Sequence, residues 1–150
     1  MRILIAEDDP VFRQLLTDTL ARWGYEVVVC LDGIEACRIL QSENAPQLAI
    51  LDWKMPGMEG IDVCREIRKG SGEYYTYIIL LTSQQRDEDI VSGMEAGADD
   101  YIIKPFKLNE LRVRLRAGRR IVELQSELMA ARDILREKAS RDSLTGLLNH

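Results

Sequence analysis

The stretch Leu48-Ala49-Ile50-Leu51-Asp52 is a short apolar run that ends in an aspartate. Four similar apolar runs occupy residues 3–6, 27–29, 78–81 and 101–103. Short continuous apolar runs predict strands that are buried on both faces. Amphipathic stretches at residues 12–20 and 34–40 predict covering helices, and Pro10 is placed as at a helix start. Five alternating units of strand and helix predict an α/β fold with a parallel sheet and helices on both faces.

The composition is that of a folded, water-soluble domain. The chain has 150 residues, of which 46% are hydrophobic and 30% charged, which excludes a disordered chain. No apolar run approaches about 18 residues, so no membrane span is expected, and the early acidic residues exclude a signal peptide. The predicted location is therefore cytoplasmic. The cysteines lack a C-x-x-C pair and the single histidine is His150, so neither a disulfide framework nor a Cys/His zinc site is expected.

The charges divide the chain into an acidic front and a basic back. Residues 1–103 hold 9 Lys and Arg against 19 Asp and Glu, whereas residues 104–141 hold 11 against 5.

From Leu108 a helical pattern runs to about Arg141, a length of roughly 50 Å at 1.5 Å per residue. Its apolar residues alternate at three- and four-residue steps, and they are Ile121, Leu124, Leu128, Ala131 and Leu135. This heptad pattern predicts an extended C-terminal helix that projects and pairs with a second copy. The alternative is a solvated C-terminal helix that frays, because Gly118 in its middle costs about 1 kcal/mol relative to alanine.

Polar residues follow the predicted strands, at the edge of a parallel sheet where ligands bind. They are Glu7, Asp8 and Asp9 after the first strand, Asp52 after the third, Thr82 and Ser83 after the fourth, and Lys104 after the fifth. Asp9 is interpreted as a solvated neighbour of the site or a helix-start charge rather than as a metal ligand. The other three carboxylates repel one another unless a cation joins them, and an all-oxygen set favours Mg²⁺, with Mn²⁺ as an alternative. A cation, a lysine and a hydroxyl around a carboxylate suit a phosphoryl group.

Four motifs, in this order, resemble those of response-regulator receiver domains of two-component signalling. They are Ile-Ala-Glu-Asp-Asp-Pro at 5–10, Leu-Asp-Trp-Lys-Met-Pro-Gly-Met-Glu-Gly at 51–60, Leu-Thr-Ser at 81–83 and Asp-Asp-Tyr-Ile-Ile-Lys-Pro-Phe at 99–106. The resemblance covers residues 1–120. It implies a flavodoxin-like (βα)5 doubly wound fold with strand order 2-1-3-4-5. It also implies an aspartate that takes a phosphoryl group from a histidine kinase or a phosphotransfer protein.

Carried over by position, the resemblance makes Asp52 the phosphoacceptor. It implies that Asp8 and Asp52 ligate Mg²⁺ directly and that Glu7 holds the ion through water. The backbone carbonyl of Lys54 is implied as a further ligand. Position 54 varies in the family and influences how long the acyl phosphate survives.

The same resemblance assigns the residues around the phosphoryl group. Thr82 and the backbone N–H of Ser83 are implied to bond its oxygens, and Lys104 to neutralise one of them. Ser83 departs from the alanine or other small residue that the family often has there. Tyr101 is implied to be a switch aromatic that moves inward when Thr82 is drawn to the phosphoryl group. The peptide bond between Lys104 and Pro105 is implied to be cis.

Residues 141–150 resemble the opening of diguanylate cyclase (GGDEF) domains, with the pattern Asp-x-Leu-Thr-Gly-Leu-x-Asn. The signature loop, the GTP site and the metal carboxylates of such a domain are absent from the sequence, so this chain is not expected to make cyclic di-GMP. The predicted organisation is a receiver domain at 1–120, a coiled-coil signalling helix at 121–141 and the truncated start of an output domain at 142–150. The chain is thus expected to regulate an output domain in cis.

The resemblance to cyclases implies that two GTP-loaded domains must come together, so we expect a homodimer whose geometry changes on phosphorylation. The heptad residues Ile121, Leu124, Leu128 and Leu135 are candidate interface residues. Asp99 and Asp100 of one protomer are predicted to meet arginines of the other, namely Arg112, Arg116 or Arg119. The alternative is that these arginines are solvated or pair within one chain, where an exposed pair contributes about 0–1 kcal/mol.

The sequence departs from what three other functions require. A phosphatase of the haloacid-dehalogenase type needs Asp-x-Asp after its first strand, where this chain has Glu7. An FMN carrier needs a phosphate loop rich in hydroxyls and glycines, where this chain is acidic. A DNA-binding regulator would use the basic last helix, but no helix-turn-helix follows it in the sequence and the chain is acidic overall, so nucleic acid is not an expected partner. A receiver that controls a non-cyclase or DNA-binding output remains an alternative.

Overall fold

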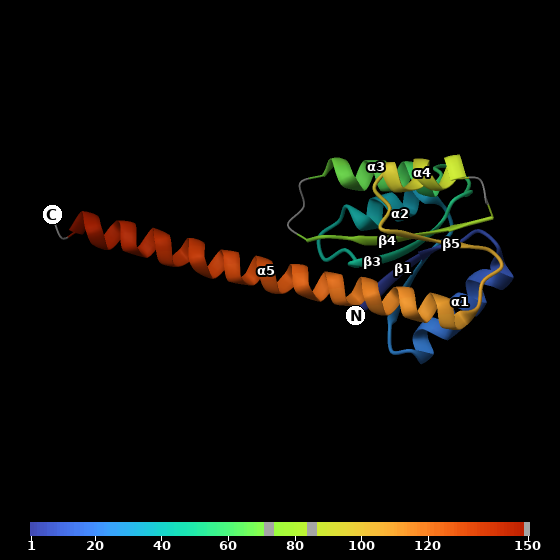
Figure 1. Ribbon diagram of the computed structural model, residues 1–150, viewed down its shortest axis with the longest axis horizontal. Helices are drawn as coiled ribbons and strands as arrows, with labels where there is room; N and C mark the ends of the chain where they lie inside the picture. Colours follow the sequence, from blue (N-terminus) through green and yellow to red (C-terminus); the bar gives the residue numbers. More distant parts are fainter. Residues whose placement is uncertain (71–73, 84–86, 149–150) are drawn as a thin grey trace.

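The computed structural model describes residues 1–70, 74–83 and 87–148. Strands and helices alternate throughout (Figure 1). The strands are β1 (Arg2–Ala6), β2 (Glu26–Cys30), β3 (Leu48–Asp52), β4 (Tyr77–Thr82) and β5 (Asp100–Ile103). The helices are α1 (Pro10–Arg22), α2 (Gly33–Leu40), α3 (Gly60–Lys69), α4 (Asp87–Glu95) and α5 (Leu108–Leu148). All five predicted strands are therefore confirmed, and Pro10 begins α1 as predicted.

The five strands form one sheet in the order β2-β1-β3-β4-β5, and every neighbouring pair is parallel. This is the flavodoxin-like arrangement that the resemblance implied. The strand order reverses beside β1, because the chain moves to β2 on one side and then crosses to β3 on the other. Side chains at the carboxyl ends of β1, β3, β4 and β5 therefore gather at one edge, where open parallel sheets bind ligands.

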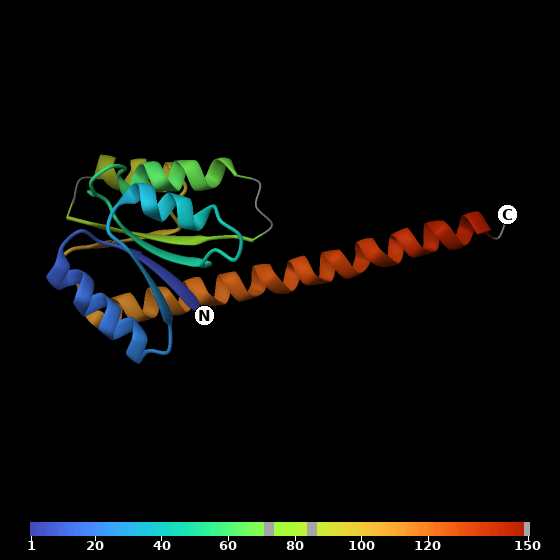
Figure 2. The same cartoon turned by 180° about the vertical axis from the view of Figure 1, so that it is seen from behind.

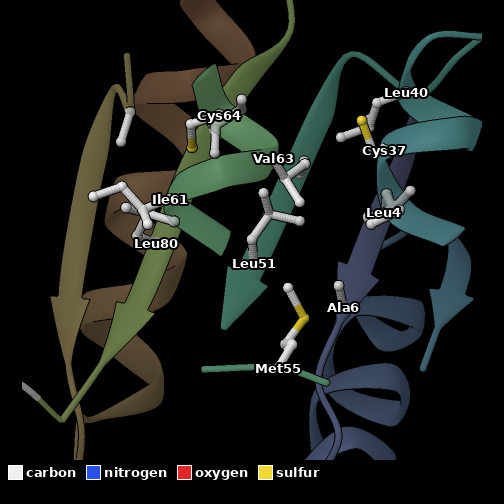
Figure 3. Packing of buried hydrophobic residues seen from close by; sticks show 14 of the residues in the cluster. Leu4, Ala6, Cys37, Leu40, Leu51, Met55, Ile61, Val63, Cys64 and Leu80 are labelled. Atoms are coloured by element: carbon white, nitrogen blue, oxygen red, sulfur yellow. The ribbon is translucent and has the colours of Figure 1, made fainter. Parts of the chain in front are cut away.

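Two hydrophobic clusters fill the two faces of the sheet. Alternate residues of a strand point to opposite faces, so Leu4 packs on one side and Ile5 on the other. Helices α2 and α3 cover the first face, and Figure 3 shows Cys37 and Cys64 packed there among aliphatic side chains. Helices α1 and α5 cover the second face (Figures 1 and 2). The predicted covering of both faces is confirmed.

The two edge strands depart from the prediction of strands buried on both faces. The central strands β3 and β4 are buried at every residue, whereas β2 is buried only at Cys30 and β5 only at Ile102. An edge strand has a neighbour on one side only, so water reaches its side chains. The apolar run at residues 27–29 thus identified a strand correctly but overstated its burial.

Helix α5 is much longer than the domain it covers. Its first turns pack on the sheet through Leu111, Leu115 and Val122, and the remainder projects far beyond the domain (Figures 1 and 2). The helix continues to Leu148 rather than ending near Arg141. Residues 142–148, predicted as the start of an output domain, therefore continue the helix in this chain, while residues 149 and 150 lie outside the described residues. Within the described part, no helix has the length and apolar character needed to cross a bilayer.

The sequence leaves Gly118 unexplained in the middle of a helix, where glycine costs about 1 kcal/mol relative to alanine. In the structure, α5 lies so close to the start of β4 that a Cβ at position 118 would sit 2.5 Å from the ring of Tyr77. Gly118 therefore allows the helix backbone to approach this ring. The contact lies one turn before Val122, the last residue of α5 in the buried cluster on this face.

Candidate functional site

Three carboxylates meet at the carboxyl edge of the sheet. Glu7 and Asp8 directly follow β1, and Asp52 is the last residue of β3. One carboxylate oxygen from each lies within 4.8 Å of those of the other two. The side chain of Glu7 is buried, that of Asp52 is 12% exposed, and Asp8 is exposed. The cluster thus runs from the interior of the domain to its surface.

Lys104, the residue after β5, supplies the positive charge at this edge. Its Nζ lies 3.0 Å from Oε2 of Glu7 and 3.3 Å from Oδ1 of Asp52. The same ammonium group lies 4.7 Å from the centre of the Phe12 ring. The Lys104–Pro105 peptide bond is cis, as the resemblance implied. The lysine therefore contacts two carboxylates that come from different strands.

The environment of Asp52 raises the pKa of its carboxyl group to about 6. Burial is the largest cause, because it removes water from the charged form, and the negative charge of Glu7 adds to it. The charge of Lys104 acts in the opposite direction. One lysine thus offsets only part of the negative charge of the cluster. A divalent cation bound by these oxygens would offset the rest.

Backbone contacts fix the position of Asp52. The N–H of Trp53 donates to the carbonyl of Leu81 on β4 (2.8 Å), and the N–H of Gly60 donates to the carbonyl of Trp53 (2.9 Å). A Cβ at position 60 would lie 2.4 Å from the carbonyl oxygen of Asp52, so only glycine permits this close approach of α3. The ring of Trp53 is half-buried beneath α4, against Gly93. An indole therefore lies beside Asp52.

The structure places the other predicted site residues around this edge. Thr82 is the last residue of β4 and is buried, and its carbonyl accepts a hydrogen bond from the N–H of Lys104 (2.8 Å). Ser83 is exposed at the next position, and Tyr101 is half-buried on β5. The side chain of Lys54 is exposed, and the role of its carbonyl stays a prediction. Asp9 caps α1 by accepting from the N–H of Val11 (3.1 Å), which confirms its helix-start interpretation.

The predicted dimer residues lie on different sides of the domain. Asp99 accepts from Arg68 (2.8 Å), and Asp100 accepts two hydrogen bonds from Arg114 (2.9 Å each), all within one chain. The guanidinium of Arg112 lies 5.5 Å from the centre of the Trp23 ring. Arg119 lies 5.9 Å from that of Tyr25 and pairs with Glu123 (3.1 Å). Contacts between these groups across a dimer stay a prediction.

Sequence reasoning gave no role to Tyr75, which the structure places in a polar network. Its hydroxyl donates to Asp99, whose carboxylate also accepts from the N–H of Ile78 (2.8 Å). The guanidinium of Arg68 lies 4.6 Å from the centre of the Tyr75 ring and donates through Nε to Gly97 (2.9 Å). The network joins α3, β4 and the start of β5. Because its members are up to 31 positions apart, no local pattern could have revealed it.

Comparisons with known proteins agree with this geometry. Residues 3–116 match the response regulator receiver domain family. The chain is 42% identical over 134 residues to the DNA-binding response regulator MtrA of Mycolicibacterium smegmatis, a match that covers 89% of this chain and 57% of MtrA. The structure resembles a Francisella response regulator receiver domain with a TM-score of 0.71 and 30% identity, covering 78% of this chain and 94% of that one.

A second solved structure bears on the acidic cluster. The receiver domain of a sensor histidine kinase from Pseudomonas aeruginosa has a magnesium ion coordinated in its active-site cleft. Its TM-score to this chain is 0.70 at 32% identity, and the likeness covers 78% of this chain and 95% of that one. In this chain the three clustered carboxylates likewise offer oxygen ligands, which hard divalent cations prefer.

Proposed function

This chain belongs to the response regulator receiver domain family, and we propose that it accepts a phosphoryl group on Asp52 from a histidine kinase or a phosphotransfer protein in the cytoplasm. The observation that carries the proposal is the placement of Asp52 at the end of β3, with Lys104 Nζ 3.3 Å from its carboxylate. Thr82, at the end of the neighbouring strand, provides a hydroxyl at the same edge. These groups match the needs of a phosphoryl group for positioning and charge neutralisation.

The proposal includes a divalent cation, Mg²⁺ with Mn²⁺ as an alternative, held by Asp8 and Asp52 and, through water, by Glu7. When bound, this ion would neutralise negative charge on the transferring phosphoryl group. The backbone carbonyl of Lys54 is proposed as an additional ligand. This assignment agrees with the all-oxygen donor set of the cluster.

The chemical step begins with Asp52 in its ionised form. A carboxylate oxygen of Asp52 forms a bond to phosphorus while the bond from phosphorus to the donor histidine nitrogen breaks. The electron pair of that bond stays on the imidazole, and the product is an acyl phosphate on Asp52. Lys104 stabilises the negative charge of the phosphoryl oxygens, and Thr82 donates a hydrogen bond to one of them. As Thr82 moves toward the phosphoryl group, Tyr101 is proposed to turn inward and transmit the change.

Intact mass of the chain after incubation with Mg²⁺ and acetyl phosphate tests this proposal. We expect the wild type to gain the mass of one phosphoryl group and Asp52→Ala to gain none, because the nucleophilic carboxylate is missing. Asp18→Ala removes an exposed carboxylate of α1 and should be phosphorylated like the wild type. A chelator should prevent the adduct. An adduct that persists in Asp52→Ala, or that forms equally well without a divalent cation, contradicts the proposal.

We further propose that phosphorylation alters a homodimer and so regulates an output domain in cis. Residues 142–149, with their resemblance to a GGDEF opening, support a diguanylate cyclase as that output. The similarity to MtrA supports a second candidate, a DNA-binding output. The chain spans 57% of the length of MtrA, so the similarity itself reaches only part of that protein.

The coding sequence that follows His150 distinguishes the two outputs. Continuation into a GGDEF signature loop supports the cyclase, and continuation into a helix-turn-helix or winged helix supports DNA binding. A stop codon directly after His150 contradicts both.

A further inference from the structure

Helix α5 carries two apolar stripes that point in different directions. The first is the buried row Leu111, Leu115, Gly118 and Val122, which faces the sheet. The second, which we call the α5 seam, consists of Ala117, Ile121, Leu124, Leu128, Ala131 and Leu135, all exposed. At about 100° per residue, the seam lies roughly a third of a turn away from the buried row. The domain therefore does not cover it.

The α5 seam exposes large aliphatic side chains to solvent. Leu124 is 53% exposed, Leu128 is 67% exposed and Leu135 is 66% exposed. These side chains follow each other at heptad steps on a helix that projects from the domain (Figure 2). A heptad stripe of this kind is buried when a second helix packs along it. The structure thus presents a surface that fits another helix with the same spacing.

The charges beside the seam favour a particular partner and direction. When the seam residues occupy the core heptad positions, Glu127 lies on one side of the seam and Arg132 on the other. In a parallel pair of identical helices, a residue on the first side faces the residue five positions later on the second side of the partner. Glu127 of each protomer then faces Arg132 of the other, and symmetry forms this pair twice.

Neighbouring residues fit the same arrangement. Position 134, on the same side as Glu127, is isoleucine, and position 139, which it would face, is alanine. At the start of the seam, Arg114 occupies a core position, but its guanidinium is held by Asp100 (2.9 Å) and Glu110 (3.4 Å). Its charge is therefore balanced within its own domain before the helices meet.

We propose that α5 pairs with α5 of a second copy of this chain as a parallel, in-register coiled coil along the α5 seam, with two Glu127–Arg132 ion pairs beside it. The inference rests on the proposed regulation through a homodimer and adds the direction of pairing, the register and the flanking ion pairs. Helix pairing begins at Ala117 and Ile121, beside Val122, the last residue of α5 in the buried cluster on this face of the sheet. A rotation of α5 at the domain edge therefore changes how the two seams meet.

This arrangement assigns the predicted interface residues to two groups. Ile121, Leu124, Leu128 and Leu135 belong to the seam. Arg112 and Arg119 lie on the opposite flank of α5, beside Trp23 and Tyr25, and Arg116 shares that flank by its helical spacing. A dimer formed along the seam leaves these three arginines outside the helix pair.

Disulfide cross-linking of the full chain tests the direction of pairing. Leu124→Cys and Leu135→Cys place thiols at two seam positions about 16 Å apart along the helix. In a parallel, in-register pair, each introduced thiol lies opposite the same thiol of the second helix. Both variants should therefore form covalent dimers under mild oxidation. Asp133→Cys, on the outer side of the helix, is the control and should not. The native cysteines are buried, and burial raises the pKa of Cys30 and Cys64 to about 12, which keeps them unreactive.

Charge exchange tests the register. Glu127→Arg and Arg132→Glu each place like charges opposite each other, so each should weaken dimerisation by about tenfold, and the double exchange should restore it. Cross-linking of only one of the two cysteine variants indicates an antiparallel pair and overturns the proposal. Equal cross-linking of all three, or no cross-linking of any, also overturns it. Phosphorylation of Asp52, read by mass, is measured independently, so failure of helix pairing is distinguishable from failure of the phosphoacceptor function.

Discussion

Lys104→Met should slow phosphorylation of Asp52 by acetyl phosphate by at least about 100-fold, because it removes a preorganised positive charge from the site. The methionine retains an unbranched stem beside Phe12, so the change is mainly one of charge. Lys104 lies 3.0 Å from the buried Glu7 and 3.3 Å from Asp52. Its loss leaves these carboxylates without their cation and should also lower the free energy of unfolding of the metal-free chain by about 3 kcal/mol.

Two measurements separate these effects. The rate at which the phosphoryl adduct appears by mass reports on chemistry, and urea unfolding in the presence of a chelator reports on stability. Lys107→Met, which removes the charge of an exposed lysine nearby in the sequence, is the control and should change neither. A Lys104→Met variant that remains folded and is phosphorylated within threefold of the wild-type rate contradicts the role given to this lysine.

Asp52→Asn should make the metal-free chain more stable than the wild type at neutral pH, even though it removes the proposed nucleophile. The pKa of Asp52 is raised from its usual 3.8 to about 6 in the folded protein. The folded state therefore binds a proton more tightly than the unfolded state, and stability falls as pH rises from about 4 to above 6. At pH 7 the ionised carboxylate costs about 2–3 kcal/mol, a cost that asparagine avoids.

Urea unfolding at several pH values, with a chelator present, checks this expectation. The difference between Asp52→Asn and the wild type should be largest near pH 7–8 and should vanish below about pH 3, where Asp52 is protonated in both the folded and the unfolded state. Added Mg²⁺ should favour the wild type, because binding to the folded state stabilises it. Glu43→Gln, at an exposed carboxylate, is the control. A wild type that is more stable than Asp52→Asn at pH 7 in chelator excludes this electrostatic account.

Much of the fold and the candidate site could be predicted from sequence because both depend on short patterns. Apolar runs identified the five strands, and the residues directly after them identified the edge where Glu7, Asp8 and Asp52 meet. Once a parallel sheet is established, its topology brings residues far apart in the chain together. The contact of Lys104 with Glu7, 97 positions away, is an example.

What the sequence could not predict depends on three-dimensional packing. Apolar content did not distinguish the edge strand β2 from the central strand β3, because burial is set by neighbouring strands. From the sequence alone, Gly118 only lowers the stability of the helix, whereas the structure shows that it allows α5 to approach the ring of Tyr77. Likewise, the spacing of Arg112 and Arg119 showed that they share a helix face but not that this face lies against Trp23 and Tyr25.

The proposed site and the contact between Gly118 of α5 and Tyr77 lie at opposite ends of β4. Thr82 ends β4 beside Asp52, whereas Tyr77 begins β4 beside Gly118. Tyr101, on the neighbouring strand β5, pairs in register with Leu80 of β4. A change at the phosphoryl site thus has a short, packed route to the place where α5 leaves the domain. Such a route supports, as a proposal, the control of helix pairing by phosphorylation.

The most direct test of the whole account is sedimentation of the wild-type chain with Mg²⁺, with and without beryllium fluoride as a phosphoryl mimic. Tryptophan fluorescence, to which Trp53 beside the site contributes, serves to verify that the mimic has bound. We predict that the monomer–dimer dissociation constant changes by at least about fivefold when the mimic binds, and that Asp52→Ala shows no change. An equilibrium that is identical with and without bound mimic contradicts the claim that phosphorylation of Asp52 acts through α5.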